Sequence, residues 1–160
     1  MAMRPRSQYY IPGLARVYAN LDEWAHVLIR VALGAILIPH GMQKLFGAFS
    51  GPGMTNFIGL LQKVGYSPAV ASMFGWIIAL LEFGGGILLI IGLFTRPIAF
   101  AVLIFMLEAV RFHYGRAGTM FWTAPGSGFE YPLILAAIAL YLLIRGSGPH
   151  SVDARMGKEF

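Results

Sequence analysis

Four long apolar stretches run through the chain, and shorter segments rich in glycine, proline and polar residues separate them. An α-helix that crosses the hydrocarbon core of a bilayer needs about 20 mostly apolar residues, because each residue adds about 1.5 Å. The stretches predict spans over residues 24–46, 69–94, 97–114 and 129–144. The predicted fold class is therefore all-α, a four-helix transmembrane bundle with short interfacial amphipathic helices.

Local signals indicate two of the boundaries. Ser67 before Pro68 is typical of a helix that begins with an N-cap residue and a proline in its first turn. Arg96 and Pro97 predict a tight turn before the third span.

Two shorter segments repeat apolar residues at helical spacing, one before the first span and one between the first two spans. The apolar positions are Leu14, Val17, Tyr18 and Leu21 in one segment and Met54, Phe57, Ile58 and Leu61 in the other. We expect both to be amphipathic helices at the membrane surface. The loop of residues 115–128 contains Phe121 and Trp122, so we expect it to fold back over the bundle at headgroup depth.

The composition supports a membrane location. Only 12% of the residues are charged, whereas about 25% is usual in soluble domains, and 58% are hydrophobic with a mean hydropathy of +0.69. A water-soluble domain of this length would need more polar side chains on its surface, while lipid favours an apolar exterior. We identify no cleavable signal peptide, so the first span is predicted to be an uncleaved membrane signal.

The chain contains no cysteine, which excludes disulfides, Cys-ligated zinc and iron–sulfur clusters. No metal site is predicted, and electron chemistry would require a bound cofactor or a partner protein. The formal net charge is +5, but the basic residues are scattered rather than gathered into a patch. Nucleic-acid binding is therefore not expected.

The basic residues favour one side of the membrane. The two terminal segments and the loop between the second and third spans contain seven of them: Arg4, Arg6, Arg16, Arg96, Arg145, Arg155 and Lys158. The other two loops contribute Lys63 and Arg116. The positive-inside rule thus predicts that both termini are cytoplasmic. The predicted organisation is a cytoplasmic N-terminal segment with an interfacial helix (1–23), a membrane domain (24–145) and a cytoplasmic tail (146–160).

Several ionisable residues lie inside the predicted spans, where an isolated charge is costly and usually marks a functional site. They are Arg30, His40 and Lys44 in the first span, Glu82 in the second, Glu108, Arg111 and His113 in the third, and Glu130 at the start of the fourth. Apart from the histidines, these residues are three cations and three carboxylates. This balance predicts mutual neutralisation.

Helix geometry predicts which of these charges meet. Counted from the cytoplasmic ends, Glu82 and Glu108 lie about 18 and 16 Å deep, and Arg30 lies about 9 Å deep. In the second span, small residues lie on the same face as Glu82: Gly75, Ala79 and Gly86. In the first span, Gly34 and Gly41 lie on the same face as Arg30 and Lys44. We expect the two faces to meet, with Arg30 reaching Glu82 and Arg111 pairing with Glu108 one turn away.

Each residue also has a structural interpretation. Arg30 could be an anchor at the interface, and Lys44 could mark the end of the span. His40 follows Pro39 and could bond a backbone carbonyl that the proline frees. Glu82 is either paired or protonated, and either state could serve proton or substrate handling.

Three motifs in order carry a resemblance to a known family. They are the runs His40-Gly41-Met42-Gln43-Lys44-Leu45-Phe46-Gly47, Glu82-Phe83-Gly84-Gly85 and Gly92-Leu93-Phe94-Thr95-Arg96. Over roughly residues 24–145 the chain resembles the DoxX family of small four-helix membrane proteins. The resemblance implies a multi-pass protein of a bacterial inner membrane, associated with quinone-linked redox complexes.

Two hypotheses for function follow. In the first, the chain is a membrane subunit of a quinone-linked oxidoreductase system that binds a small apolar redox molecule. Glu82 and His40 would be the catalytic residues that handle protons, and the substrate-binding residues would be Arg30, Lys44, Glu108 and Arg111.

A quinone is the candidate cofactor in this hypothesis, and a redox protein the expected partner. Haem is disfavoured, because His113 lies about 140° around the helix from Glu108. In the second hypothesis the chain is a non-catalytic carrier, scaffold or assembly factor whose buried ion pairs are structural. A homo-oligomer is compatible with both.

Overall fold

The structure is a computed structural model of the chain and describes residues 10–121 and 128–159. Every regular element among these residues is helical, which confirms the predicted all-α class. In chain order the elements are α1 (Leu14–Phe46), the 3-10 turn η2 (Ala48–Ser50), α2 (Gly53–Lys63), α3 (Pro68–Leu80), the π-helical turn η3 (Leu81–Gly85), α4 (Gly86–Ile91), α5 (Thr95–Ala117), α6 (Glu130–Arg145) and α7 (Val152–Met156).

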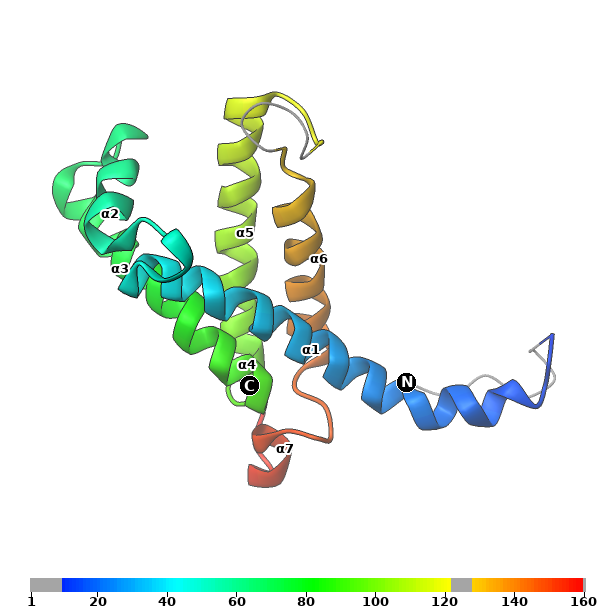
Figure 1. Cartoon of the computed structure of the whole chain (residues 1–160). Helices are drawn as coiled ribbons and strands as arrows, with labels where there is room; N and C mark the ends of the chain where they lie inside the picture. Colours follow the sequence, from blue (N-terminus) through cyan, green and yellow to red (C-terminus); the bar gives the residue numbers. More distant parts are fainter. Residues whose placement is uncertain (1–9, 122–127, 160) are drawn as a thin grey trace.

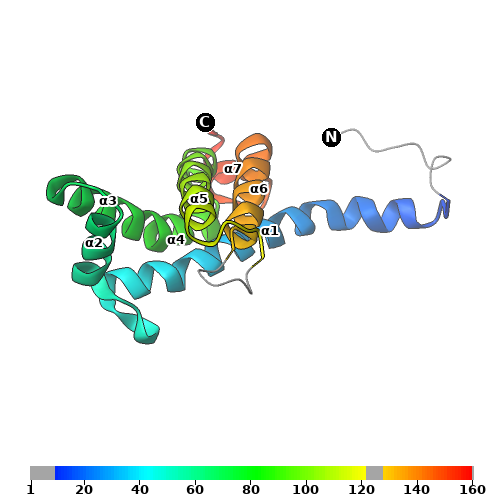
Figure 2. The same ribbon diagram turned by 90° about the horizontal axis from the view of Figure 1, so that it is seen from above.

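Two helical layers cross each other in this molecule. Helices α5 and α6 form an antiparallel hairpin, and α1 crosses it obliquely (Figure 1). The helix formed by α3, η3 and α4 runs back along the second half of α1, and α2 packs on α3 (Figure 2). A buried apolar core joins the layers, and its members include Leu33 and Leu37 of α1, Leu89 of α4, Val102 of α5 and Leu135 of α6.

Three helices of the described chain are long and apolar enough to cross a membrane: Leu14–Phe46, Pro68–Ile91 and Thr95–Arg116. They match the first three predicted spans. The fourth predicted span forms as α6, but its 16 residues reach only about 24 Å, which is short of the hydrocarbon thickness. A fourth complete crossing therefore stays a prediction.

The helix boundaries differ from prediction at two places. Helix α1 begins at Leu14, so the predicted helix before the first span is present but continues into that span without a break. The turn before α5 lies at residues 92–94 rather than at Arg96, because Gly92 and Phe94 both adopt left-handed backbone angles there. The position of residues 14–23 at the membrane interface stays a prediction.

Helix α1 packs very closely on η3 and α4, as the small residues predict. A Cβ on Gly34 would lie 2.5 Å from the Gly86 carbonyl oxygen, and one on Gly41 would collide with the backbone of Phe83. Gly75 makes a different contact, because it faces Ile58 of α2. Only glycine at these positions lets the helices approach to this separation.

The predicted amphipathic helix between the first two spans is α2. Phe57 is buried, and the side chain of Ile58 packs on α3. The apolar side of α2 thus covers neighbouring helices of the same chain. Of the aromatic residues expected in the loop of residues 115–128, Phe121 is exposed, while Trp122 lies outside the described residues.

Candidate functional site

A buried ion pair joins the first two spans. The Lys44 ammonium lies 2.5 and 2.8 Å from the two carboxylate oxygens of Glu82, and the side chains are only 14% and 5% exposed. Removing two charges from water is costly, and close hydrogen-bonded geometry of this kind is what offsets the cost. Lys44 is therefore a partner of Glu82, in addition to standing near the end of its helix.

The π-helical turn places Glu82 at this interface. A π-turn inserts one residue into the α-helical register and often occurs at functional sites. Here it spans Leu81–Gly85, so the carboxylate leaves the helix where Gly41 lets α1 come closest. The spacing of apolar residues does not predict this π-helical turn.

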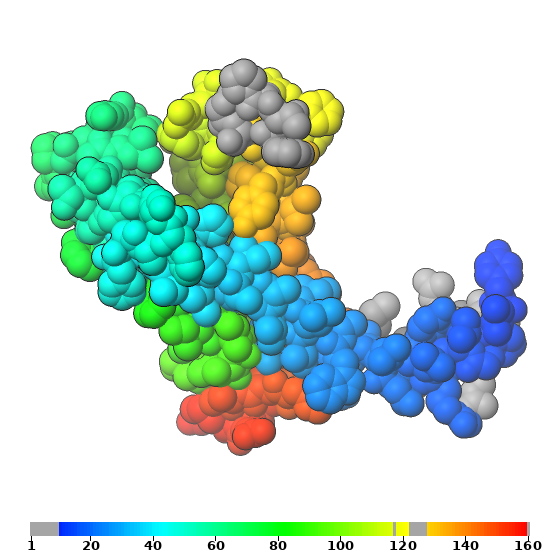
Figure 3. Space-filling view, viewed as in Figure 1, coloured from blue at the N-terminus to red at the C-terminus, as the bar shows by residue number. Residues whose placement is uncertain are grey.

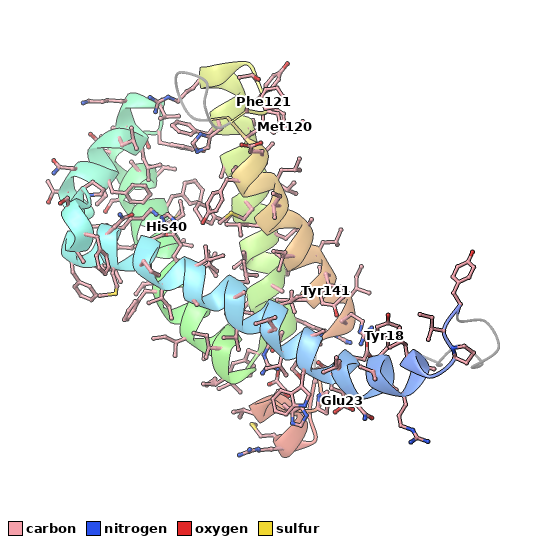
Figure 4. The ribbon with its side chains drawn as sticks, turned by 45° about the vertical axis from the view of Figure 1, so that its right-hand side comes forward. Tyr18, Glu23, His40, Met120, Phe121 and Tyr141 are labelled. Carbon is pink, nitrogen blue, oxygen red and sulfur yellow. The ribbon has the colours of Figure 1, made fainter. Side chains whose placement is uncertain are left out.

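His40 and Tyr131 lie beside the ion pair. The Tyr131 hydroxyl is 3.4 Å from His40 Nε2, and Tyr131 also interacts electrostatically with Glu82. Figure 4 labels His40 in the half of α1 far from the N-terminus. We call His40, Lys44, Glu82 and Tyr131 the ion-pair cluster. It joins α1, η3 and α6, and sequence reasoning missed Tyr131 because a tyrosine at a span end is common.

The ion-pair cluster also has an aromatic side. The Lys44 ammonium lies 5.1 Å from the centre of the Phe57 ring of α2, a cation–π distance. Helix α2 thus covers Lys44 with the Phe57 ring, while Tyr131 is exposed. The arrangement offers one charged pair, one imidazole and one hydroxyl at the edge of an apolar bundle.

Arg30 does not pair with Glu82, so that predicted contact is wrong. Its guanidinium is buried and donates to the backbone carbonyls of Ser147 and, at 2.7 Å, His150 in the C-terminal tail. Arg30 precedes Lys44 by 14 residues, about 21 Å along α1, so the two side chains lie at different levels along the helix. Its role in substrate binding stays a prediction.

The C-terminal tail packs on the end of the molecule where Arg30 lies. The Asp153 carboxylate accepts hydrogen bonds from the backbone N–H groups of Phe94 (2.9 Å) and Thr95 (3.1 Å) at the start of α5. Glu159 accepts from the backbone N–H of Ser147. The tail thus binds α1 through Arg30 and the α4–α5 turn through Asp153.

The N-terminal half of α1 meets the same end of the molecule. His26 Nε2 donates to the Gly146 carbonyl at 3.1 Å, and Glu23 lies 3.3 Å from the His150 ring. Figure 4 shows Glu23 and Tyr141 near the tail, far from His40. We call Arg30, Ser147, His150 and Asp153, with the backbone they bind, the tail cluster. Sequence reasoning did not foresee it, since most of its bonds use backbone groups.

Glu108 and Arg111 form the third polar feature, on α5. Their side chains pair at 2.9 Å as predicted, but both are exposed, at 56% and 68%. Arg111 also interacts with Tyr66 of the turn before α3. The pair belongs to a separate surface from the ion-pair cluster, so the structure does not assemble the six predicted site residues into a single pocket.

The described part of the chain is helical, and three of its helices are apolar and as long as a bilayer is thick. A buried ion pair joins two of these helices. This architecture is that of an integral membrane protein. The DoxX family model matches residues 25–115, and the chain belongs to the DoxX family. A relative from Haemophilus influenzae, described as an uncharacterized protein, is 29% identical over 144 residues, which cover 88% of this chain and 98% of the relative. No solved structure matches the chain.

Proposed function

We propose that the protein is a membrane subunit of a quinone-linked oxidoreductase system and binds the quinone head group at the ion-pair cluster. The observation that carries the proposal is the pairing of His40 with Tyr131 beside buried Lys44 and Glu82. A quinone ring presents two carbonyl oxygens on an apolar body. A hydroxyl and an imidazole at the edge of an apolar bundle match both features.

The chemistry requires protons as well as electrons. Reduction of a quinone to a quinol consumes two electrons and two protons. The chain has no cysteine to hold an iron–sulfur cluster, so a redox partner protein would supply the electrons. Tyr131 and His40 would donate hydrogen bonds to the carbonyl oxygens, and the His40 imidazole would relay a proton.

Lys44 changes the role first expected for Glu82. In this proposal Glu82, which the Lys44 ammonium holds at 2.5 Å, fixes the position of Lys44, and His40 relays the proton. The same observation favours a second candidate function. If the pair only fixes the register of α1 against η3, the protein is a scaffold or assembly factor without chemistry of its own.

Binding of a short-chain ubiquinone or menaquinone analogue to the purified protein in detergent tests the proposal. Quenching of tryptophan fluorescence reports the affinity. Tyr131→Phe should weaken binding about fivefold, the effect of one lost hydrogen bond of about 1 kcal/mol. Tyr114→Phe is the matched control, because Tyr114 is also an exposed tyrosine near the start of α6, but its ring contacts Phe129 rather than His40.

The two candidate functions give different results in this experiment. Quinone binding that Tyr131→Phe weakens and Tyr114→Phe leaves unchanged supports the redox subunit. The absence of saturable quinone binding by a folded protein would exclude it and leave the scaffold. Purification from bacterial inner membranes in mild detergent, with identification of accompanying redox proteins, tests the proposed location and partner independently.

A further inference from the structure

Helix α5 carries an exposed ion pair well away from both of its ends. Glu108 and Arg111 stand 13 and 16 residues after Thr95, about 20 and 24 Å along a helix of about 33 Å. The C-terminal tail packs on the start of α5, and the last residues of α5 lead into the loop before α6. In the predicted crossing the pair lies within the hydrocarbon, where exposed charges are rarely found without a protein partner.

The pair lies on α5, the least buried of the three long helices. Only 17% of the most apolar window of α5 is buried, against 33% in each of the other two spans. One continuous stripe carries the exposed side chains at spacings of four and three residues, and its members are Phe100, Ile104, Leu107, Arg111 and Tyr114. Glu108 borders the stripe next to Arg111. Such spacing is typical of a face that packs on another helix.

Contacts among the described residues leave this face largely exposed. Arg111 interacts with Glu108 and Tyr66, yet its side chain remains 68% exposed. Figure 3 shows the α2–α3 part of the molecule standing apart from the upper part of α5, with a notch between them. The intrachain contacts thus orient the guanidinium and leave most of it available.

We propose that this face of α5 is the contact surface for a second copy of the same chain. The argument is charge complementarity: the face carries one acid and one base, three residues and about 4.5 Å apart along the axis. A two-fold axis along the membrane normal places two such faces together with each residue at the depth of its own copy. Glu108 of each chain is then offset by only about 4.5 Å in depth from Arg111 of the other, within reach of both side chains. Each charge then has two partners, and the apolar stripe is covered.

Charge reversal tests the proposal, because it separates contacts between copies from contacts within one copy. Glu108→Arg makes the face doubly positive, and Arg111→Glu makes it doubly negative. Each variant alone should lose the ability to retain a differently tagged copy of itself in mild detergent. The two variants expressed together should retain each other, although neither chain regains its own Glu108–Arg111 pair.

A cross-linking measurement covers the case in which a charge-reversed chain fails to fold. The protein has no cysteine, so Leu107→Cys introduces a single thiol on the proposed surface. Mild oxidation in native membranes should give a disulfide-linked dimer. Leu133→Cys on α6, an exposed leucine away from this face, is the matched control and should stay monomeric.

Three outcomes would overturn the proposal: self-retention by either charge-reversed variant, failure of the two variants to retain each other when both are folded, or equal cross-linking at Leu107→Cys and Leu133→Cys. Loss of quinone binding has no bearing on these measurements. The contact surface and the proposed function can therefore fail independently.

Discussion

Lys44 on α1 and Glu82 on η3 are buried together, so the cost of burying either one depends on the presence of the other. Their atoms meet at 2.5 and 2.8 Å, and α2 places the Phe57 ring against the ammonium. Breaking a buried pair by removing one member typically costs about 3–5 kcal/mol, whereas replacing both members can be almost neutral. The two kinds of substitution therefore separate pairing from packing.

Lys44→Met should lower the stability of the folded protein by about 3–5 kcal/mol, because Glu82 is left as an unpaired buried carboxylate. Denaturation in detergent micelles, followed by circular dichroism, measures the loss. Lys44→Met combined with Glu82→Gln should recover most of it, since no charge then remains buried. A double variant as unstable as the sum of the two single variants would show that the pair contributes nothing beyond packing.

The sequence was sufficient to single out Glu82 but not to identify its partner. Counting 1.5 Å per residue put Arg30 closer in depth to Glu82 than Lys44. The count assumes a helix along the membrane normal, whereas α1 crosses the α5–α6 hairpin obliquely (Figure 1). A tilted helix rises less per residue, so residues near its far end lie less deep than the count predicts. Lys44 thus reaches the level of Glu82, while Arg30 stays with the tail.

At the level of elements, glycine contacts hold α1 against η3 and α4. Gly41→Ala should destabilise the protein by about 1–3 kcal/mol, because its new methyl group meets the backbone of Phe83 and forces the helices apart. Gly84→Ala is the control in the same π-turn. A Cβ there meets no described atom within 4 Å, and alanine favours a helix by up to about 1 kcal/mol.

Thermal unfolding of the two variants in the same detergent distinguishes them. The midpoint should fall for Gly41→Ala and stay level or rise for Gly84→Ala. An equal fall for both would indicate that the π-turn itself requires glycine, rather than the contact between the helices.

The tail is a second element whose effect can be isolated. Asp153→Ala should cost about 1–3 kcal/mol, because the N–H groups of Phe94 and Thr95 lose their acceptors at a largely buried turn. Arg155→Ala on the same short helix should change stability by less than about 0.5 kcal/mol, since its side chain is exposed. Denaturant titration of both variants gives the comparison, and equal effects would exclude the capping role.

Element positions were far more predictable than element details. Apolar length and the Ser67–Pro68 boundary placed the helix ends to within a few residues, apart from the start of α1, which lies ten residues before the predicted span. The π-turn and the turn at Gly92 depend on how α3, α4 and the tail pack after the helices form. The length of an apolar stretch contains no information on such packing. The hydrogen bonds of the tail cluster could not be predicted from the sequence for the same reason.

For the whole molecule, three segments that the distribution of basic residues predicts to be cytoplasmic meet at one end. Asp153 of the tail binds the α4–α5 turn, and Asp22 near the start of α1 lies 3.8 Å from Arg145 at the end of α6. A common end is what a chain with two termini on one side of the membrane requires. The cytoplasmic orientation of this end stays a prediction.

Thiol labelling in intact cells tests both the orientation and the fourth crossing, since the native chain has no cysteine to label. A membrane-impermeant maleimide should modify Lys63→Cys and Met120→Cys, because positive-inside places both loops outside. Arg155→Cys should react only after the cells are permeabilised. The opposite pattern would reverse the orientation and keep the number of crossings. Equal labelling of Met120→Cys and Arg155→Cys would instead show that the α5–α6 hairpin does not span the membrane, because the tail is bound to the start of α5.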